Sequence, residues 1–365
     1  MNALLTWAAR LRVVWACLLA LAVGALLIAA SGVSPWLAYR ALFATAYLDY
    51  WGFASTLVKT SPILLAALAV AVPLRAGLFN IGAEGQIYAG ALTATLAGLF
   101  LPELPGGIGI AVVMLAAMAG GALWAAIPGY LKAYRGVNEV IVTLLLNFVA
   151  IQLVSYAVSG PLLAQGAPYP YSEELAPALR LPILMPQTDA HIGALFGLGL
   201  AVLLHFHFRF TAHGHALDLV GRNAQAAAYA GVAVRRELLL AMMAGGALAG
   251  LAGGIEVLGL KYRLFHLFSP GYGFDGIVVA FMAAGNLAWL PLGALLMGGL
   301  KAAANGMQRA VGVEGTVVDA IQGLVVIFVA ASQHASLRRW FARPSRGPRV
   351  AKPEAPAAVT VQEAA

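Results

Sequence analysis

The chain has 365 residues, of which 61% are hydrophobic and 10% are charged, and its formal net charge is +7 at pH 7. Soluble domains contain roughly 45–50% apolar and about 25% charged residues, so this composition excludes an ordinary water-soluble globular protein. Anionic lipid and membrane topology account for the surplus of positive charge, and no nucleic-acid partner is needed.

Apolar segments follow one another along the whole chain. In chain order they lie at residues 13–31, 55–73, 87–101, 108–130, 140–159, 190–208, 238–255, 276–284, 290–304 and 316–332. About 20 apolar residues are needed to cross a hydrocarbon core of about 30 Å. The sequence therefore predicts an all-α polytopic membrane protein with about ten transmembrane helices, some of them interrupted by glycine. The two segments around Gly285-Asn286 fit re-entrant half-helices as well.

The first apolar segment resembles a signal peptide in its flanks, because Arg10 and Arg12 precede it and small residues follow it. Its length of about 19 residues exceeds the roughly 7–15 of a signal-peptide core, so we expect a retained helix. Cys17, inside this segment, is the single cysteine of the chain, which excludes an internal disulfide.

Lysine and arginine are distributed unevenly between alternate loops. With the N-terminus inside, the outer loops hold only Arg40, Arg180, Lys261, Arg263 and Arg309, and the inner loops hold most of the others. The positive-inside rule therefore predicts that both termini are cytoplasmic. The outer loop at residues 160–188 is rich in proline, so we expect it to be irregular.

The most informative polar segment is residues 75–86, where Asn80, Glu84 and Gln86 lie among glycines between two apolar segments. Glycine allows a helix to break, and freed backbone groups at membrane depth are tolerated only where they line a cavity or are buried in protein. This pattern predicts a substrate path. A plain cytoplasmic turn with a solvated Glu84 is the alternative, and spacing alone favours neither.

A second polar segment begins the apolar run at 140–159. Glu139, Thr143 and Asn147 are four residues apart and therefore share one helical face. Polar side chains in a span face the bundle interior or a cavity, or they join helices by hydrogen bonds. We expect the second role for Thr143 and a solute contact for Asn147.

A third segment, residues 271–276, brings Asp275 between glycines to the start of a short apolar run, as Glu84 is brought to the start of another. Two interrupted regions in the two halves of a chain indicate a binding site in transporters built from repeats. Charged residues also lie in or near other spans, where each needs a partner or water. They are Lys59, Glu256, Lys301 and Asp319.

Several catalytic motifs are absent from the sequence. It contains no G-x-x-x-x-G-K-[ST] phosphate loop, no H-E-x-x-H and no G-x-S-x-G. We therefore expect no ATPase or other enzyme activity in this chain and no cofactor. His205/His207 and His213/His215 form two H-x-H pairs, but without cysteine we expect interface histidines and no metal site.

These three polar segments, together with the inner-loop segment 221–231, resemble the permeases of bacterial ABC importers of the branched-chain amino acid and simple-sugar superfamily. The likeness is greatest to the nucleoside branch, which is linked to basic membrane lipoproteins. The motifs that carry it are residues 77–86, 136–147, 221–231 and 271–280, and the first is specific to that branch. After Ala280 the chain departs from the leucine-rich run of such permeases, which bears on the solute rather than on the fold.

The resemblance implies a permease domain at residues 1–340 and leaves residues 341–365 as a disordered cytoplasmic tail. The inner-loop segment 221–231 would be the coupling helix that contacts the ATPase, with functional residues Gly221, Arg222, Asn223, Ala227, Tyr229 and Gly231. The implied partners are an ABC ATPase subunit, a second permease subunit in a heterodimer, a periplasmic or lipoprotein solute-binding protein, and membrane lipids. The implied location is the bacterial inner membrane.

The implied function is ATP-driven import of a small polar solute, in the first place a nucleoside or nucleobase. The residues expected along the substrate path are Asn80, Glu84, Gln86, Glu139, Asn147 and Asp275. Three alternatives remain: an ABC importer for a simple sugar, an ion-coupled secondary transporter that uses Glu84, Asp275 or Asp319, and a polytopic enzyme acting on lipid.

Overall fold

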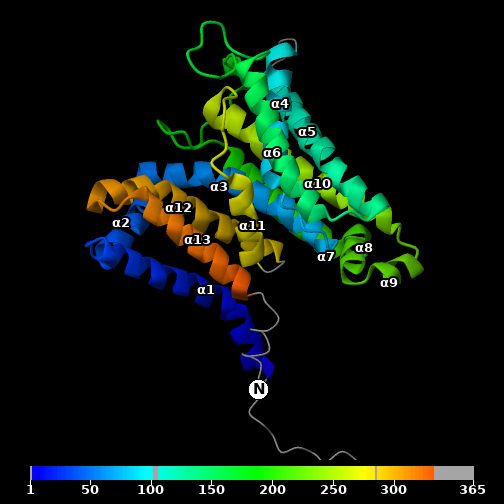
Figure 1. The fold of residues 1–365 in the computed structure, drawn as a ribbon, viewed down its shortest axis with the longest axis horizontal. Helices are drawn as coiled ribbons and strands as arrows, with labels where there is room; N and C mark the ends of the chain where they lie inside the picture. The colour runs from blue at the N-terminus through cyan, green and yellow to red at the C-terminus, as the bar shows by residue number, and fades with distance from the viewer. Residues whose placement is uncertain (1, 102–105, 284–285, 333–365) are drawn as a thin grey trace, which may run out of the picture.

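The computed structural model describes residues 2–101, 106–283 and 286–332 (Figure 1). The helices are α1 (Asn2–Ala30), α2 (Pro35–Tyr47), α3 (Tyr50–Arg75), α4 (Ala83–Phe100), α5 (Gly106–Arg135), α6 (Glu139–Ser159), α7 (Gly193–Phe210), α8 (Ala212–Arg222), α9 (Ala224–Tyr229), α10 (Val234–Glu256), α11 (Tyr272–Met282), α12 (Leu290–Val311) and α13 (Gly315–Ser332). Short turns of other helix types are η1 (Pro177–Leu179), η2 (Val257–Lys261) and η3 (Leu287–Trp289). In these residues the all-α prediction is confirmed. The expected disordered tail, residues 341–365, lies outside them.

Six helical segments are long and apolar enough to cross a membrane. They are Tyr50–Arg75, Gly107–Arg135, Glu139–Ser159, Gly193–Phe210, Val234–Lys261 and Leu287–Ala304. The pair α1 and α2, bent by 118°, adds a seventh if it is one broken span. The apolar helices α11 and α13 are shorter, and α4 carries Glu84 and Gln86 in its first turns. Ten full spans and cytoplasmic termini therefore stay predictions.

Two helices form the centre of the molecule. In α3 and α10, 83% and 67% of the span is buried inside the chain, against 28% in α5 and in α6 and 22% in α7. Figure 1 shows α3 crossing the middle of the molecule, and it packs against α7, α10, α11 and α12. Because α5, α6 and α7 leave most of their apolar surface uncovered, these three helices provide the face that suits lipid.

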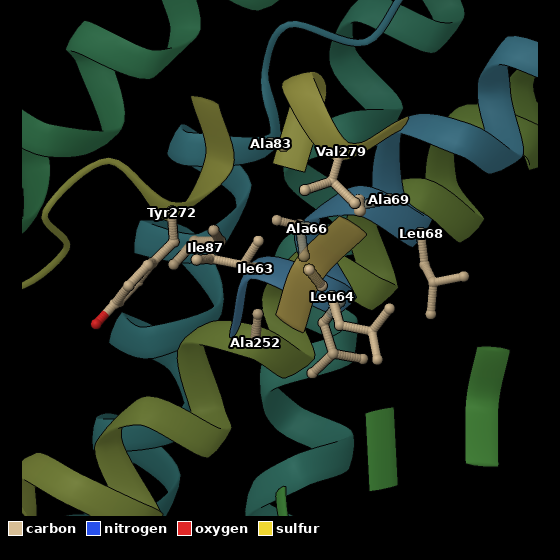
Figure 2. Close-up of a cluster of buried hydrophobic side chains, with 14 of the residues drawn as sticks. Ile63, Leu64, Ala66, Leu68, Ala69, Ala83, Ile87, Ala252, Tyr272 and Val279 are labelled. Atoms are coloured by element: carbon tan, nitrogen blue, oxygen red, sulfur yellow. The ribbon is translucent and has the colours of Figure 1, made fainter. Parts of the chain in front are cut away.

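The core lies where α3, α4, α10 and α11 meet. Ile63 of α3, Ile87 of α4, Ala252 of α10 and Tyr272 and Val279 of α11 converge there (Figure 2). All of these side chains are almost completely buried. The helices α4 and α11 are thus held in the protein interior by α3 and α10.

Glycines on α10 allow this close packing. A Cβ atom at Gly250 would overlap the carbonyl oxygen of Ala117 in α5, and one at Gly253 would overlap that of Ile87 in α4. Lipid tails give helices no hydrophobic reason to associate, so close backbone approach over small residues is a main source of stability in a membrane. The glycine-rich sequence of α10 therefore serves packing.

Two sequence expectations about loops need correction. Arg40, expected in an outer loop, lies in α2, because Pro35 starts a helix at its first position and the following residues continue it. The inner loop expected after residue 210 contains α8 and α9. The proline-rich segment at 160–188 is irregular as expected, with only η1 and isolated bridges such as Tyr171 to Phe265.

Candidate functional site

The segment between α3 and α4, residues 76–82, is not helical and is largely buried. Two amide side chains form hydrogen bonds that hold this segment in place. Asn80 Nδ2 donates to Ala69 O (3.2 Å) and to Gln86 Oε1 (3.0 Å), and Gln86 Nε2 donates back to Asn80 Oδ1 (3.1 Å). Asn80 Oδ1 also accepts from Gly82 N (3.0 Å). Asn80 and Gln86 thus replace the backbone bonds that the helix break removes, as membrane depth requires.

Asn147 of α6 holds the same break from the other side. Its Oδ1 accepts from Gly85 N (2.8 Å) and its Nδ2 donates to Ile81 O (2.9 Å). Gly85 N is one of the donors that the first turn of a helix leaves without an internal partner. Asn147 therefore caps α4 from a neighbouring helix, while Thr143 donates only to carbonyls of its own helix.

Glu84 joins the two interrupted regions of the chain. Its side chain is buried, with 2% exposed, and Oε2 accepts from Gly273 N (2.7 Å). Gly273 lies in the first turn of α11, so a carboxylate from the first turn of α4 meets the positive end of a second helix. The burial of Glu84 excludes the alternative of a solvated turn, and the first turns of α4 and α11 converge on this residue.

Asp275 lies on the other side of the same helix end. Lys301 Nζ of α12 is 2.7 Å from Asp275 Oδ2 and donates to Pro270 O (3.0 Å). α11 has 11 residues, about 16 Å of helix, which is about half of a hydrocarbon core. A half-length helix whose N-terminus lies inside the protein is the form that transporter binding sites take.

Two further residues of this region were noted in the sequence only as charges without assigned partners. Lys301 is the partner of Asp275, and Glu256 of α10 is buried with its Oε1 3.5 Å from the hydroxyl of Tyr272. The only sequence signal for either was a charge inside an apolar run. Their partners are distant in sequence, so no local pattern identifies them.

Glu139 lies at the edge of this region, where it accepts a hydrogen bond from the backbone of Phe79 in the segment 76–82. It forms an ion pair with Lys132 (2.8 Å) across the turn between α5 and α6. Lys132 keeps 34% of its side chain exposed, so the pair lies near the surface. Of the six residues expected along a path, Asn80 and Gln86 bond to each other, and Asn147 bonds to the backbone of the same break. Glu84 and Asp275 lie in the adjoining helix starts.

The inner-loop segment forms two helices where one short coupling helix was expected. Gly221 and Arg222 end α8, Asn223 caps α9 by accepting from Gln225 N and Ala226 N (both 3.0 Å), and Gly231 follows with φ 84°. The break occurs because the extended backbone of Asn223 turns the chain between the two helices. The expected single helix is therefore corrected to a helical pair.

The helix α9 is exposed almost all round. Ala227 is buried, whereas Tyr229 has 94% of its side chain exposed. Figure 1 shows α8 and α9 together at one edge of the molecule. An exposed aromatic side chain on a small-residue helix is a surface typical of a contact with another protein.

The α8–α9 pair is joined to the end of α3 through α8, and this contact region is called the base of the pair. Arg75, the last residue of α3, binds Asp218 of α8 through both carboxylate oxygens (2.9 and 3.0 Å). Gly221 lies so close that a Cβ atom would overlap the carbonyl oxygen of Arg75. The end of α8 is therefore joined to the end of α3, directly before the buried break that contains Asn80.

Histidines of both H-x-H pairs contact one another beside this base. His207 Nε2 is 3.1 Å from His213 Nδ1, and His213 Nε2 is 3.1 Å from Glu237. Within the described residues, no three histidine, cysteine or acidic side chains are grouped as metal ligands would be.

Comparison with known families gives the class of protein. Residues 52–330 match the family described as branched-chain amino acid transport system, permease component. The chain belongs to this permease family. The match covers α3 to α13 almost completely and includes both interrupted regions and the α8–α9 pair, so the resemblance inferred from the motifs is confirmed.

Three relatives of this permease are named for guanosine, for glucose and for nucleosides. The guanosine ABC transporter permease protein NupP of Bacillus subtilis is 37% identical, over 87% of this chain and 92% of its own length. The glucose ABC transporter permease protein TsgB13 of Haloferax volcanii is 36% identical, over 87% and 86%. The nucleoside ABC transporter permease protein NupB of Lactococcus lactis is 29% identical, over 84% and 86%.

Proposed function

We propose that this permease is the pore-forming subunit of an ATP-driven importer that carries a nucleoside or nucleobase into the bacterial cytoplasm across the inner membrane. The observation that carries the proposal is the family match over residues 52–330, together with relatives named for guanosine and nucleosides. The chain has no phosphate-binding loop in its sequence, so the energy would come from an ATPase on another chain.

The substrate path would pass the two helix starts that meet at Glu84. Asn80, Gln86, Asn147 and Asp275 surround this point, and their amides and carboxylates match the donor and acceptor edges of a nucleobase. These groups now bond to one another and to backbone. Opening the path would exchange those bonds for bonds to the solute, which is how buried polar contacts support two states.

The α8–α9 pair would receive the ATPase. Support comes from the exposure of Tyr229 and from the ion pair of Arg75 with Asp218, which joins the pair to α3. The remaining partners in the proposal are a second permease subunit, forming a heterodimer, and a periplasmic or lipoprotein binding protein that delivers the solute. Closure of the ATPases would push on α9 and move the end of α3.

The transport proposal can be tested on the importer isolated by a tag on this chain and reconstituted in proteoliposomes with its binding protein. We expect radiolabelled guanosine to accumulate with ATP on the ATPase side, and not with a non-hydrolysable analogue. An uncoupler should leave uptake unchanged. Uptake that proceeds without ATP and collapses with the uncoupler would instead establish an ion-coupled transporter.

A simple sugar is the second candidate solute, because a relative named for glucose is as similar as the one named for guanosine. Competition in the same vesicles separates the two. Excess unlabelled adenosine should abolish guanosine uptake and excess glucose should leave it intact. ATP-dependent accumulation of labelled glucose without guanosine uptake would overturn the nucleoside as the solute. It would agree with the other part of the proposal, an ATP-driven importer.

The coupling role is tested with matched tyrosines. Tyr229→Glu should lower ATP-driven uptake by about tenfold, because a charge would replace an aromatic contact at the centre of the ATPase interface. Tyr169→Glu, on the exposed loop between α6 and α7, changes the same residue type and should leave uptake unchanged. Equal uptake by both variants would show that α9 is not the ATPase contact.

A further inference from the structure

A pocket of about 660 Å³ lies at the base of the α8–α9 pair, away from the helix starts around Glu84. Its lining comes from the ends of α3 and α7, from α8 and from the start of η3. The lining residues are Arg75, His205, Phe208, Arg209, Phe210, His215, Asp218 and Asn286. A volume within roughly 300–1,000 Å³ is that of a small-molecule site.

The charge of this pocket is positive. It contains two arginines and two histidines against one carboxylate, and that carboxylate, Asp218, is held at 2.9 and 3.0 Å by Arg75. Arg209 has no ion pair among the residues that the structure describes, and its guanidinium lies 5.8 Å from the ring centre of Phe210. The pocket therefore offers Arg209 and the two histidines to an anion.

The face of α7 next to the one that bears His205 and Arg209 is apolar. Phe206 and Phe210 stack with ring centres 5.8 Å apart and are 54% and 68% exposed. They lie in the last turns of α7, a candidate span that is only 22% buried and so would face lipid. A ligand in the pocket would meet arginine and histidine, and the exposed rings of Phe206 and Phe210 would lie beside it on the same turns of α7.

We propose that this pocket binds a phosphate-bearing anion, and that its source is the headgroup of an anionic phospholipid. Basic pockets at the ends of membrane helices bind such headgroups, and the rings of Phe206 and Phe210 suit the start of the acyl chains. Free inorganic phosphate shares the chemistry of the headgroup but would use only the cationic end. The bound phosphate would lie beside the contact of Arg75 with Asp218, where it stabilises the base of α8.

The test measures lipid bound to the purified full-length chain in nanodiscs of phosphatidylcholine that contain a small fraction of labelled phosphatidylglycerol. We expect the wild type to retain phosphatidylglycerol over phosphatidylcholine, and Arg209→Ala to lower this preference about tenfold, since a charge-assisted contact is lost. Arg236→Ala removes the same charge from the exposed start of α10, outside the pocket, and should retain the preference. Thermal unfolding of each variant establishes that it is folded.

A second arm titrates the same protein in phosphatidylcholine nanodiscs with inorganic phosphate by calorimetry. The wild type could bind inorganic phosphate, lose this binding in Arg209→Ala, and show no preference for phosphatidylglycerol. That result would overturn the lipid headgroup as the ligand and assign the site to free phosphate. If the wild type neither prefers phosphatidylglycerol nor binds inorganic phosphate, the proposal is overturned. An equal loss in Arg236→Ala and Arg209→Ala would also overturn it, because general surface charge would then explain the binding.

Discussion

At the scale of single residues, the polar side chains of this membrane protein support interrupted backbone. Asn80 and Gln86 bond to each other, and Asn147 supplies both a donor and an acceptor to the start of α4. In lipid, a backbone group without a partner costs several kcal/mol. The amides therefore hold the break between α3 and α4 in place whether or not they also contact a solute.

Replacing Asn147 tests this role. Asn147→Ala leaves Gly85 N and Ile81 O without their partners, each worth about 1–3 kcal/mol when buried, so we expect a lower unfolding temperature of the purified chain. Thr143→Val, one turn earlier on the same face, removes only bonds within α6 and should change the unfolding temperature far less. If both variants unfold at the same temperature, Asn147 does not hold the break.

At the scale of elements, the helices α4 and α11 depend on the glycine face of α10 and on α3. α10 packs against α3, α4 and α5, and α11 packs against α3. Composition identified these segments as apolar, but it did not indicate which faces approach closely. That information lies in residues without side chains, which carry no hydrophobic signal.

A pair of glycine variants separates packing from helix propensity. Gly250→Ala introduces a Cβ that overlaps Ala117 O, and we expect destabilisation by about 1–3 kcal/mol. At Gly199 of α7 nothing lies within 4 Å of an added Cβ, so Gly199→Ala should be neutral or stabilising by up to about 1 kcal/mol. Thermal unfolding in detergent measures both. A Gly250→Ala protein as stable as Gly199→Ala would contradict the close approach of α5 and α10.

At the scale of the whole molecule, the direction of the chain in the membrane is still a prediction. α7 is a single candidate span between the loop that contains Tyr169 and the α8–α9 pair that contains Tyr229. The two tyrosines should therefore face opposite sides of the membrane. The positive-inside rule places Tyr229 in the cytoplasm.

Cysteine labelling in cells checks this orientation. In a Cys17→Ser background, Tyr169→Cys should react with an impermeant maleimide before the inner membrane is opened, and Tyr229→Cys only afterwards. Both tyrosines are highly exposed, at 73% and 94%, so accessibility within the chain does not limit either reaction. The reverse pattern would invert the topology, and labelling of both in intact membranes would remove α7 from the spans.

The sequence by itself determined the membrane class, the segments that become helices, the family and the polar positions at Asn80, Glu84, Gln86, Asn147 and Asp275. These are readable because hydropathy and local motifs depend on neighbours along the chain. It missed α2 and the division of the coupling segment at Asn223. The number of ten spans stays a prediction.

Only the tertiary structure decided which groups meet. Glu84 and Gly273 are 189 positions apart, Arg75 and Asp218 are 143 apart, and Lys301 reaches back to Asp275 from another helix. Such pairs form because a buried polar group must find a partner wherever the fold brings one. No local pattern encodes that choice. The packing of α3, α10 and their glycines decided it.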